Sequence, residues 1–486
     1  RARAQESQSI LISGESGAGK TENTKICMSY LAAVDMRAGG ASAGVVEVTT
    51  RVLQTNPLLE AFGNASTTRN DNSSRFGKFI KLQYNALGKQ VGAHIDTYLL
   101  ERSRVVRQAP LERNFHVFHA LTGGISAVER EELGVGDAPT YHYLGRRPLE
   151  EIALKKTSEF ADDAEVWGRT LRALSALGCS DADIGEVSNV LATVLALGEL
   201  TFAGEETNEG HTSTPADADV LARAAARLGV EPAELSAKMC TRYVAAPDGW
   251  FTVHLTVQQC CNARDALAKA LYGRLFDWLV ARANETICPN AVYDADADAD
   301  GPRAGAGARR SEGLDGGFIG ILDIFGFESF VVNSFEQLCI NYANEALQAQ
   351  FNAYVFRQQQ AEYETEGVPW QRIDFSDNAQ VLNMIEDKRQ GVLTLLDEEC
   401  MLGQGTVAGF FTKLKSAQDK CPNFSVPRIA RESLAFTIEH YAGPVTCAPR
   451  GDVRIERLSC RAPSLPLAAR RLPRHRTPRL TRARSR

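Results

Sequence analysis

Hydrophobic and polar positions recur along the chain in patterns that predict its strands. Short apolar runs at 9–13 and 318–323 predict buried strands. Strict alternation at 79–84 and again at 91–100, with a turn between them, predicts a β-hairpin. One face of this hairpin is expected to carry three apolar residues, Ile80, Leu82 and Tyr84.

Helical periodicity dominates most of the remaining sequence. The helix expected after the first strand has five apolar residues on one face, Ile26, Cys27, Tyr30, Leu31 and Val34. The same spacing recurs at 46–62 and in four Ala- and Leu-rich segments, 166–177, 187–197, 218–228 and 263–284. The longest pattern, 334–366, could form a helix of ~50 Å. Two shorter helices are expected at 378–397 and 409–419.

The turn between the first strand and the first helix has the composition of a phosphate-binding loop. It reads Gly14-Glu-Ser-Gly-Ala-Gly-Lys20-Thr21 and matches the pattern G-x-x-x-x-G-K-[ST]. Its glycines let successive backbone N–H groups point at one anion, and the helix N-terminus adds about half a positive charge. A chance Gly/Ser loop is the alternative, but the flanking strand and helix argue against it. We expect a nucleoside triphosphate site made of Gly14, Glu15, Ser16, Gly17, Ala18, Gly19, Lys20 and Thr21.

Two further segments offer the metal ligands and water-positioning groups that an Mg-nucleotide hydrolase needs. The run 70–78 places hydroxyls and Arg75 immediately before a strand. Asp323 ends a buried strand, where open α/β sheets place ligand chemistry, and Gly326 lets a backbone N–H approach a phosphate. An Arg75–Glu328 pair would form a two-state gate, because losing one partner of a buried pair costs about 3–5 kcal/mol. Taken singly, these residues could equally be a strand-end cap and surface charges.

Together these patterns favour an α/β fold with a P-loop NTPase core, a mostly parallel central sheet and a large, mostly helical insertion. Residues 294–310 form a low-complexity insert whose alternating Asp residues lack the Gly and Glu of a calcium loop. After 446 the sequence is rich in Arg and Pro, which favours a disordered or misassigned tail over a basic nucleic-acid arm. The predicted domains are 1–110, a nucleotide-binding core; 111–290, a helical subdomain; 291–317, the insert; 318–446, a further subdomain; and 447–486, the tail.

Composition narrows the class of protein only a little. The net charge of −6 over 486 residues argues neither for nor against a nucleic-acid partner. Eleven cysteines without C-x-x-C spacing favour reduced thiols in a cytosolic protein, and His116 and His119 lack a third ligand for a metal site. The most apolar run, 187–202, is interrupted by Glu199 and is too short to span a bilayer. The start has no signal peptide, and Arg1 stands so close to a strand that we expect a fragment.

Three segments of the chain resemble the P-loop, switch I and switch II of the myosin motor domain family. They are 14–21, Asn70-Asp-Asn-Ser-Ser-Arg-Phe-Gly-Lys-Phe79 and Leu322-Asp-Ile-Phe-Gly-Phe-Glu328. Other similar stretches are Asn56-Pro-Leu-Leu-Glu-Ala-Phe-Gly-Asn64, Thr97-Tyr-Leu-Leu-Glu-Arg102, Asn262-Ala-Arg-Asp-Ala-Leu-Ala-Lys269 and Glu439-His-Tyr-Ala-Gly443. The resemblance covers roughly residues 5 to 446 and leaves the myosin class unassigned.

The resemblance implies an ATPase that uses ATP and Mg²⁺, with in-line attack of water on the γ-phosphate. Lys20 and Asn70 would contact the phosphates, and Mg²⁺ would be held by Thr21, by Ser74 and, through water, by Asp323. The implied catalytic residues hold the attacking water or close the back of the site, and they are Ser73, Arg75, Gly326 and Glu328. The helix at 334–366 would be the relay helix, which carries movement at switch II to distant parts of the motor.

Filamentous actin is the implied partner, and the implied location is the cytoplasm, in the cytoskeleton. Residues 397–420 resemble part of the lower actin-binding helix-loop-helix, where Lys413, Lys415 and Lys420 could meet acidic actin or form a solvated face. Light chains would need a lever arm outside this sequence, and neither a coiled coil nor a nucleic-acid partner is expected. The family's adenine-contacting loop, converter and lever arm have no counterpart here, so we expect truncation at both ends and exposed sheet edges.

The leading hypothesis is therefore an actin-activated motor head that hydrolyses Mg-ATP. A kinesin-like microtubule motor is one alternative, but it would have Ser-Ser-Arg-Ser-His in the first switch, where this chain continues with Phe76-Gly77. The other alternative is a truncated fragment that binds actin and nucleotide without producing force.

Overall fold

The structure, a computed structural model, describes most of the chain in two compact units. The described residues are 7–14, 17–35, 43–85, 90–145, 160–207, 210–246, 249–287, 317–369, 371, 377–402, 405–427 and 434–448. The first unit comprises 1–291 with 311–326, and the second comprises 292–310 with 327–486. The predicted low-complexity residues 294–310 and the predicted tail beyond 448 lie outside the described residues. The finer five-part division of the chain stays a prediction.

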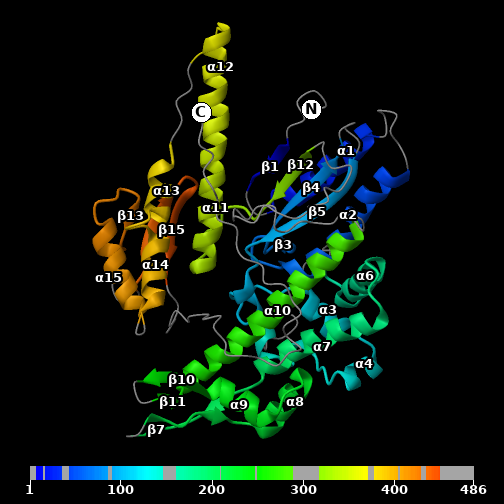
Figure 1. Cartoon of the computed structure of the whole chain (residues 1–486), viewed down its shortest axis with the longest axis vertical. Helices are drawn as coiled ribbons and strands as arrows, with labels where there is room; N and C mark the ends of the chain where they lie inside the picture. The colour runs from blue at the N-terminus through cyan, green and yellow to red at the C-terminus, as the bar shows by residue number, and fades with distance from the viewer. Residues whose placement is uncertain are drawn as a thin grey trace, which may run out of the picture. The chain divides into compact units, whose positions relative to one another are not determined.

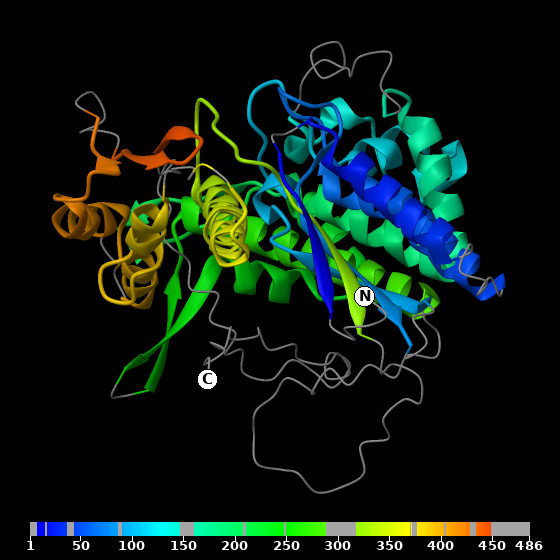
Figure 2. The ribbon, with the colours of Figure 1, turned by 90° about the horizontal axis from the view of Figure 1, so that it is seen from above.

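A four-stranded sheet organises the first unit, in the order β1 (Gln8–Ile12), β12 (Phe318–Asp323), β4 (Gly77–Tyr84) and β5 (Gln90–Tyr98). Figures 1 and 2 show these strands side by side, although β12 is far from the others in sequence. Strand β1 is parallel to β12, whereas β12 with β4 and β4 with β5 are antiparallel. The prediction of a mostly parallel sheet is therefore wrong for the described strands. The cause is the predicted hairpin itself, since a short turn can join only antiparallel strands.

One face of this sheet carries the core of the first unit. Ile80, Leu82 and Tyr84 are buried on β4, as the alternation predicts. The opposite face of the hairpin is half-exposed and polar, with Lys81 Nζ lying 2.8 Å from Asp96 Oδ2. This polar face follows the same two-residue period that buries the apolar one.

Helices account for most of the rest of the first unit and pack on the buried face and on one another. They are α1 (Lys20–Asp35), α2 (Ala43–Gly63), α3 (His116–Gly124), α4 (Ala127–Glu132), α6 (Asp163–Ala176), α7 (Asp181–Gly198), α8 (Ala218–Leu228), α9 (Pro232–Cys240) and α10 (Val257–Ile287). Small ladders complete the unit: β2 (Asn64–Ala65) with β3 (Ser73–Ser74), β6 (Phe202–Ala203) with β9 (Thr214–Pro215), β7 (Glu206–Thr207) with β8 (Gly210–His211), and β10 (Thr241–Ala246) with β11 (Gly249–His254). No helix in the described part of the chain is long and apolar enough to cross a membrane.

The predicted core face of α1 is confirmed for Cys27 and Leu31, which are half-buried and pack against the core, and is wrong for its other three residues. Ile26, Tyr30 and Val34 are 64%, 67% and 42% exposed. The helix instead buries Thr24 and Met28, together with Ala32 one turn further on. Both stripes have helical spacing, so periodicity alone could not choose between them.

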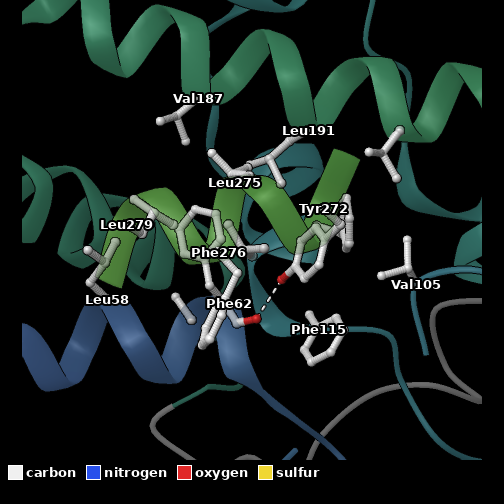
Figure 3. Packing of buried hydrophobic residues seen from close by; sticks show 14 of the residues in the cluster. Leu58, Phe62, Val105, Phe115, Val187, Leu191, Tyr272, Leu275, Phe276 and Leu279 are labelled. Carbon is white, nitrogen blue, oxygen red and sulfur yellow. Dashed lines mark hydrogen bonds between the residues drawn. The ribbon is translucent and has the colours of Figure 1, made fainter. Parts of the chain in front are cut away.

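Large side chains from α2, α7 and α10 meet in the centre of the first unit (Figure 3). Tyr272 lies among them, and its hydroxyl donates a hydrogen bond of 2.5 Å to the carbonyl of Phe62. This core reaches the chain segment after α2, because the Phe76 ring packs edge-on against Phe276 with centroids 5.1 Å apart. The Phe76 ring also lies against Gly63, where any side chain would overlap it. The residue next to Arg75 is therefore fixed by the core.

Two histidines in α3 are buried without a hydrogen-bond partner among the described residues. Neither His116 nor His119 has a partner for its ring nitrogens, and His116 stacks on Phe160 with ring centroids 4.1 Å apart. Burial lowers the pKa of both rings well below the usual value, and the guanidinium of Arg113 lowers it further. Both rings are therefore neutral in the folded protein near neutral pH.

Acidification is expected to destabilise the first unit through these histidines. The unfolded chain takes up protons near pH ~6.5 that the folded chain excludes, so stability is full above that pH and is lost below it by up to about 1.4 kcal/mol per pH unit for each histidine. Urea unfolding of the wild type and of a His116→Phe/His119→Phe variant, at pH ~7.5 and ~5.5, measures the effect. The double variant should lose less stability on acidification. A His254→Gln control, on exposed β11, should behave as the wild type does.

The described part of the second unit contains six helical segments and a three-stranded sheet. The segments are α11 (Phe335–Phe351), a π-helical stretch (Asn352–Gln358), α12 (Gln359–Glu366), α13 (Ala379–Glu386), α14 (Val392–Met401) and α15 (Val407–Gln418). The sheet order is β13 (Phe424–Ser425), β14 (Phe436–His440) and β15 (Gly443–Cys447). Its core includes Leu338, Ile385, Leu414 and Ile438.

The structure changes two helix predictions in this unit. The predicted helix at 334–366 is helical throughout, but its hydrogen bonding changes to the π type at 352–358. The predicted helix at 378–397 is two helices, because the chain turns at 387–391. There the Asp387 carboxylate accepts from the backbone N–H groups of Arg389 and Gln390, which ends one helix before the next begins.

Helix α11 also buries polar residues that apolar periodicity does not select. The fully buried Glu345 accepts hydrogen bonds from the Tyr441 backbone and the Asn378 side chain, and its carboxylate lies 3.1 Å from His440 Nδ1. These contacts tie the middle of the helix to α13 and to the end of β14. The inward face of α11 therefore combines these polar contacts with the apolar Leu338 and Ile340.

Candidate functional site

Strand register brings the three predicted nucleotide segments to one edge of the sheet. Ile12, at the end of β1, pairs in parallel with Asp323, at the end of β12. Asp323 pairs on its other side with Lys78, near the start of antiparallel β4. The loop after β1, the loop after β12 and the segment that enters β4 therefore all leave the sheet at this edge.

The phosphate loop has the backbone that its glycines predict. Gly17 and Gly19 have φ angles of 83° and 86°, in the left-handed region that favours glycine. Helix α1 begins immediately after them, so the backbone N–H groups of its first turn face the loop. Lys20 Nζ donates a 2.8 Å hydrogen bond to the carbonyl of Gly14, which places the ammonium group across the loop. Two of the predicted binding residues, Glu15 and Ser16, lie outside the described residues.

The switch I segment, 70–78, lies beside this loop. A Cβ atom added at Gly17 would lie 3.9 Å from Asn70 Cβ, so these two predicted residues are neighbours. Asn70 shapes its own turn, since its side-chain oxygen accepts a 3.1 Å hydrogen bond from the Asn72 backbone. Ser73 and Ser74 form β3, and the Ser74 hydroxyl donates to the Phe76 carbonyl at 2.8 Å.

The oxygen donors at this edge fit a magnesium ion. The Thr21 and Ser74 hydroxyls and the Asp323 carboxylate are hard ligands, which Mg²⁺ prefers, and they come from the three segments that meet there. Asp323 is 4% exposed, and its Oδ2 lies 3.3 Å from Lys78 Nζ. A buried carboxylate needs such a cation, and a divalent ion beside it would supply the same compensation.

Arg75 is fully buried at the entry to β4. Its Nε lies 2.6 Å from Glu101 Oε2, and its terminal nitrogen donates to the Ser73 hydroxyl at 3.3 Å. Glu101 is buried as well, which by itself would raise the pKa of its carboxyl; the guanidinium groups of Arg104 and Arg75 instead lower that pKa to about 2. The contact with Ser73 links Arg75 directly to another predicted catalytic residue.

Gly326 and Glu328 lie at the boundary between the units. Gly326 is the last residue of the first unit, and Glu328 belongs to the second. Glu328 is 2% exposed, and its backbone N–H and C=O both bond to the side chain of Asn341 on α11. The predicted Arg75–Glu328 pair would join the two units, and it stays a prediction.

The three lysines predicted to meet actin differ in their surroundings. Lys413 on α15 lies 2.9 Å from Glu398 and 3.0 Å from Glu399, both on α14. Lys415 and Lys420 are exposed. Any role of these residues in binding actin stays a prediction.

Sequence reasoning missed Lys78 and Glu101 as parts of this site. Lys78 stands within the switch I segment, but only strand register brings it to Asp323. Glu101 lies within a stretch that resembles the family, 97–102, yet it is 26 residues from Arg75 and no local pattern connects the two. Arg75 precedes β4 and Glu101 follows β5, so the antiparallel pairing of these strands brings the two residues together.

Comparison with known proteins agrees with this geometry. The family model described as "Myosin head (motor domain)" matches residues 2–451. The chain belongs to this family. Residues 2–451 include all three nucleotide segments of the myosin head, as well as α11 and the lysines of α15.

Relatives from several organisms are about 40% identical to this myosin head over the aligned residues. The Myosin-J heavy chain of Dictyostelium discoideum is 40% identical over 90% of this chain and 20% of its own length. Myosin-1 of Arabidopsis thaliana is 42% identical over 92% of this chain and 35% of its own, and unconventional myosin-Vb of Mus musculus is 38% identical over 91% and 22%. The chain thus spans about a fifth to a third of the length of these relatives.

Proposed function

We propose that this myosin head binds and hydrolyses Mg-ATP at the edge of its sheet and is an actin-based motor. The observation that carries the proposal is the register of Ile12, Asp323 and Lys78, which gathers a phosphate loop and two switch segments at one place. Membership of the myosin head family supports ATP as the nucleotide and actin as the partner. It also excludes the kinesin-like alternative.

In this proposal the phosphate loop binds the nucleotide, and the two switch segments supply the groups that act in its hydrolysis. Lys20 and the N–H groups of the loop hold the phosphates, with Asn70 beside them. Thr21, Ser74 and Asp323 would hold Mg²⁺, which neutralises charge on the phosphates. Ser73 and the Gly326 backbone position the attacking water, and catalysis comes from positioning and electrostatics without a covalent intermediate.

Coupling to movement is proposed to run through α11. Asn341 of this helix binds the backbone of Glu328 through both its amide nitrogen and its amide oxygen. A change in switch II would therefore be passed to a helix that is also tied to β14 through Glu345. Filamentous actin as the partner and the cytoskeleton as the location rest on the family alone, as do light chains, which would bind outside this sequence.

The test is phosphate release from Mg-ATP by the purified 486-residue chain, with and without filamentous actin. We expect turnover that actin stimulates and that chelation of Mg²⁺ abolishes. Phosphate release that actin leaves unchanged would favour the alternative of a fragment that produces no force, which the comparisons do not support. A chain that binds no nucleotide would contradict the proposal itself.

A further inference from the structure

The backbone of Arg75 is held as firmly as its side chain. Its N–H donates to the Gly63 carbonyl at 2.8 Å, and its C=O accepts from the Glu101 backbone N–H at 2.9 Å. Glu101 thus binds Arg75 twice, through its own main chain and through its carboxylate. With Phe76 packed on Gly63 and Phe276, Arg75 has little freedom to move on its own.

Glu101 stands between two buried guanidinium groups. The Oε2 atom that accepts from Arg75 Nε also accepts from Arg104 Nε, again at 2.6 Å. Arg104 uses its terminal nitrogens elsewhere, on the Glu112 carboxylate at 2.9 Å and on the Arg113 carbonyl at 2.9 Å. Every member of this cluster is at least nine-tenths buried. Arg75 and Arg104 therefore share the Glu101 carboxylate, whereas Glu112 bonds within the cluster to Arg104 alone.

We propose that Glu101 is a positioning residue for ATP hydrolysis, which acts by presetting the guanidinium of Arg75 at the site. Glu101 occupies the Nε edge of Arg75, so that the terminal nitrogens are directed to other partners, among them the Ser73 hydroxyl. A cation fixed in this way stabilises charge that develops during hydrolysis without having to reorganise first. The inference rests on the proposed function and adds to it a residue that follows the end of β5.

The test compares Glu101→Gln with the matched variant Glu112→Gln. Each removes one carboxylate charge from the same buried cluster, but only the first touches Arg75. We expect Glu101→Gln to lower kcat for Mg-ATP by about 10- to 100-fold with KM nearly unchanged, since a misplaced catalytic group affects the transition state more than binding. Glu112→Gln should keep kcat within about threefold of the wild type.

A double variant separates positioning from a merely structural role. If Glu101 acts through Arg75, adding Glu101→Gln to Arg75→Ala lowers kcat no further, whereas independent effects multiply. Should Glu101→Gln fail to fold by circular dichroism, Glu101→Asp replaces it, because it keeps the charge but is too short to reach Nε. The same loss of kcat is then expected.

The outcomes distinguish a failure of the role of Glu101 from a failure of the proposed function. Equal losses in the Glu101 and Glu112 variants, multiplicative losses in the double variant, or a normal kcat in Glu101→Asp would each overturn the role of Glu101 and leave the proposed function intact. A wild-type chain without any Mg-ATP turnover would overturn the proposed function, and this inference with it.

Discussion

Replacing Lys20 by alanine is expected to weaken nucleotide binding strongly. The Lys20 ammonium lies across the phosphate loop, 2.8 Å from the Gly14 carbonyl, and in the proposed function it contacts the phosphates. Removing one partner of such a charged pair costs about 2–5 kcal/mol, which is about 30- to 5,000-fold in Kd. Titration of the variant with a fluorescent ATP analogue in the presence of Mg²⁺ measures the loss.

A lysine on the same unit provides the control for this experiment. Lys81 lies on the polar face of β4 and pairs with Asp96, so Lys81→Ala removes the same charge from a different place. Its nucleotide affinity should match that of the wild type. An unchanged affinity in Lys20→Ala would show that the phosphate loop is not the binding site.

Arg75→Ala and Glu328→Ala are each expected to block hydrolysis while sparing nucleotide binding. Both side chains are buried, and in the gate predicted from the sequence their pairing closes the back of the site. Loss of either should lower the hydrolysis step by about 10²-fold or more. Rapid-quench measurement of the phosphate burst, beside equilibrium binding of the same nucleotide, separates the two steps. Normal burst kinetics in either variant would contradict the gate.

The structure also predicts what an exchange of the two charges would do. An Arg75→Glu/Glu328→Arg variant would restore an isolated pair, but Arg75 also neutralises Glu101. The exchange places a second carboxylate beside Glu101 in a buried cluster, where like charges strongly disfavour each other. Recovery of hydrolysis is therefore expected only when Glu101→Gln is added, and the burst amplitude of the triple variant tests this.

The backbone of the phosphate loop could be predicted because its residue pattern is local in sequence. A loop that wraps one phosphate group needs its glycines, lysine and threonine within eight positions, so the pattern and the φ angles of Gly17 and Gly19 agree. The strands at 79–84 and 318–323 were likewise predictable from side-chain alternation and apolar runs. The resemblance then assigned roles to residues that no pattern connects, such as Ser74 and Asp323.

The errors lie where packing chooses between equivalent patterns. Helix α1 has two stripes of helical spacing, and only tertiary packing places Met28 inside and Tyr30 outside. The sheet was expected to be mostly parallel because a phosphate loop is typical of parallel sheets, yet β4 and β5 form a hairpin and must be antiparallel. The turn at 387–391 depends on hydrogen bonds from one carboxylate, which apolar spacing does not report.

The sequence by itself determined which residues form the candidate phosphate loop, since that pattern depends on neighbours along the chain. Only the tertiary structure decided which charged side chains lie beside the switch residues Asp323 and Arg75. Lys78 reaches Asp323 through strand register, and Glu101 reaches Arg75 because β5 returns beside β4. A buried charge is stable only beside a partner that the fold brings close, and the sequence pattern does not show which residues the fold brings close.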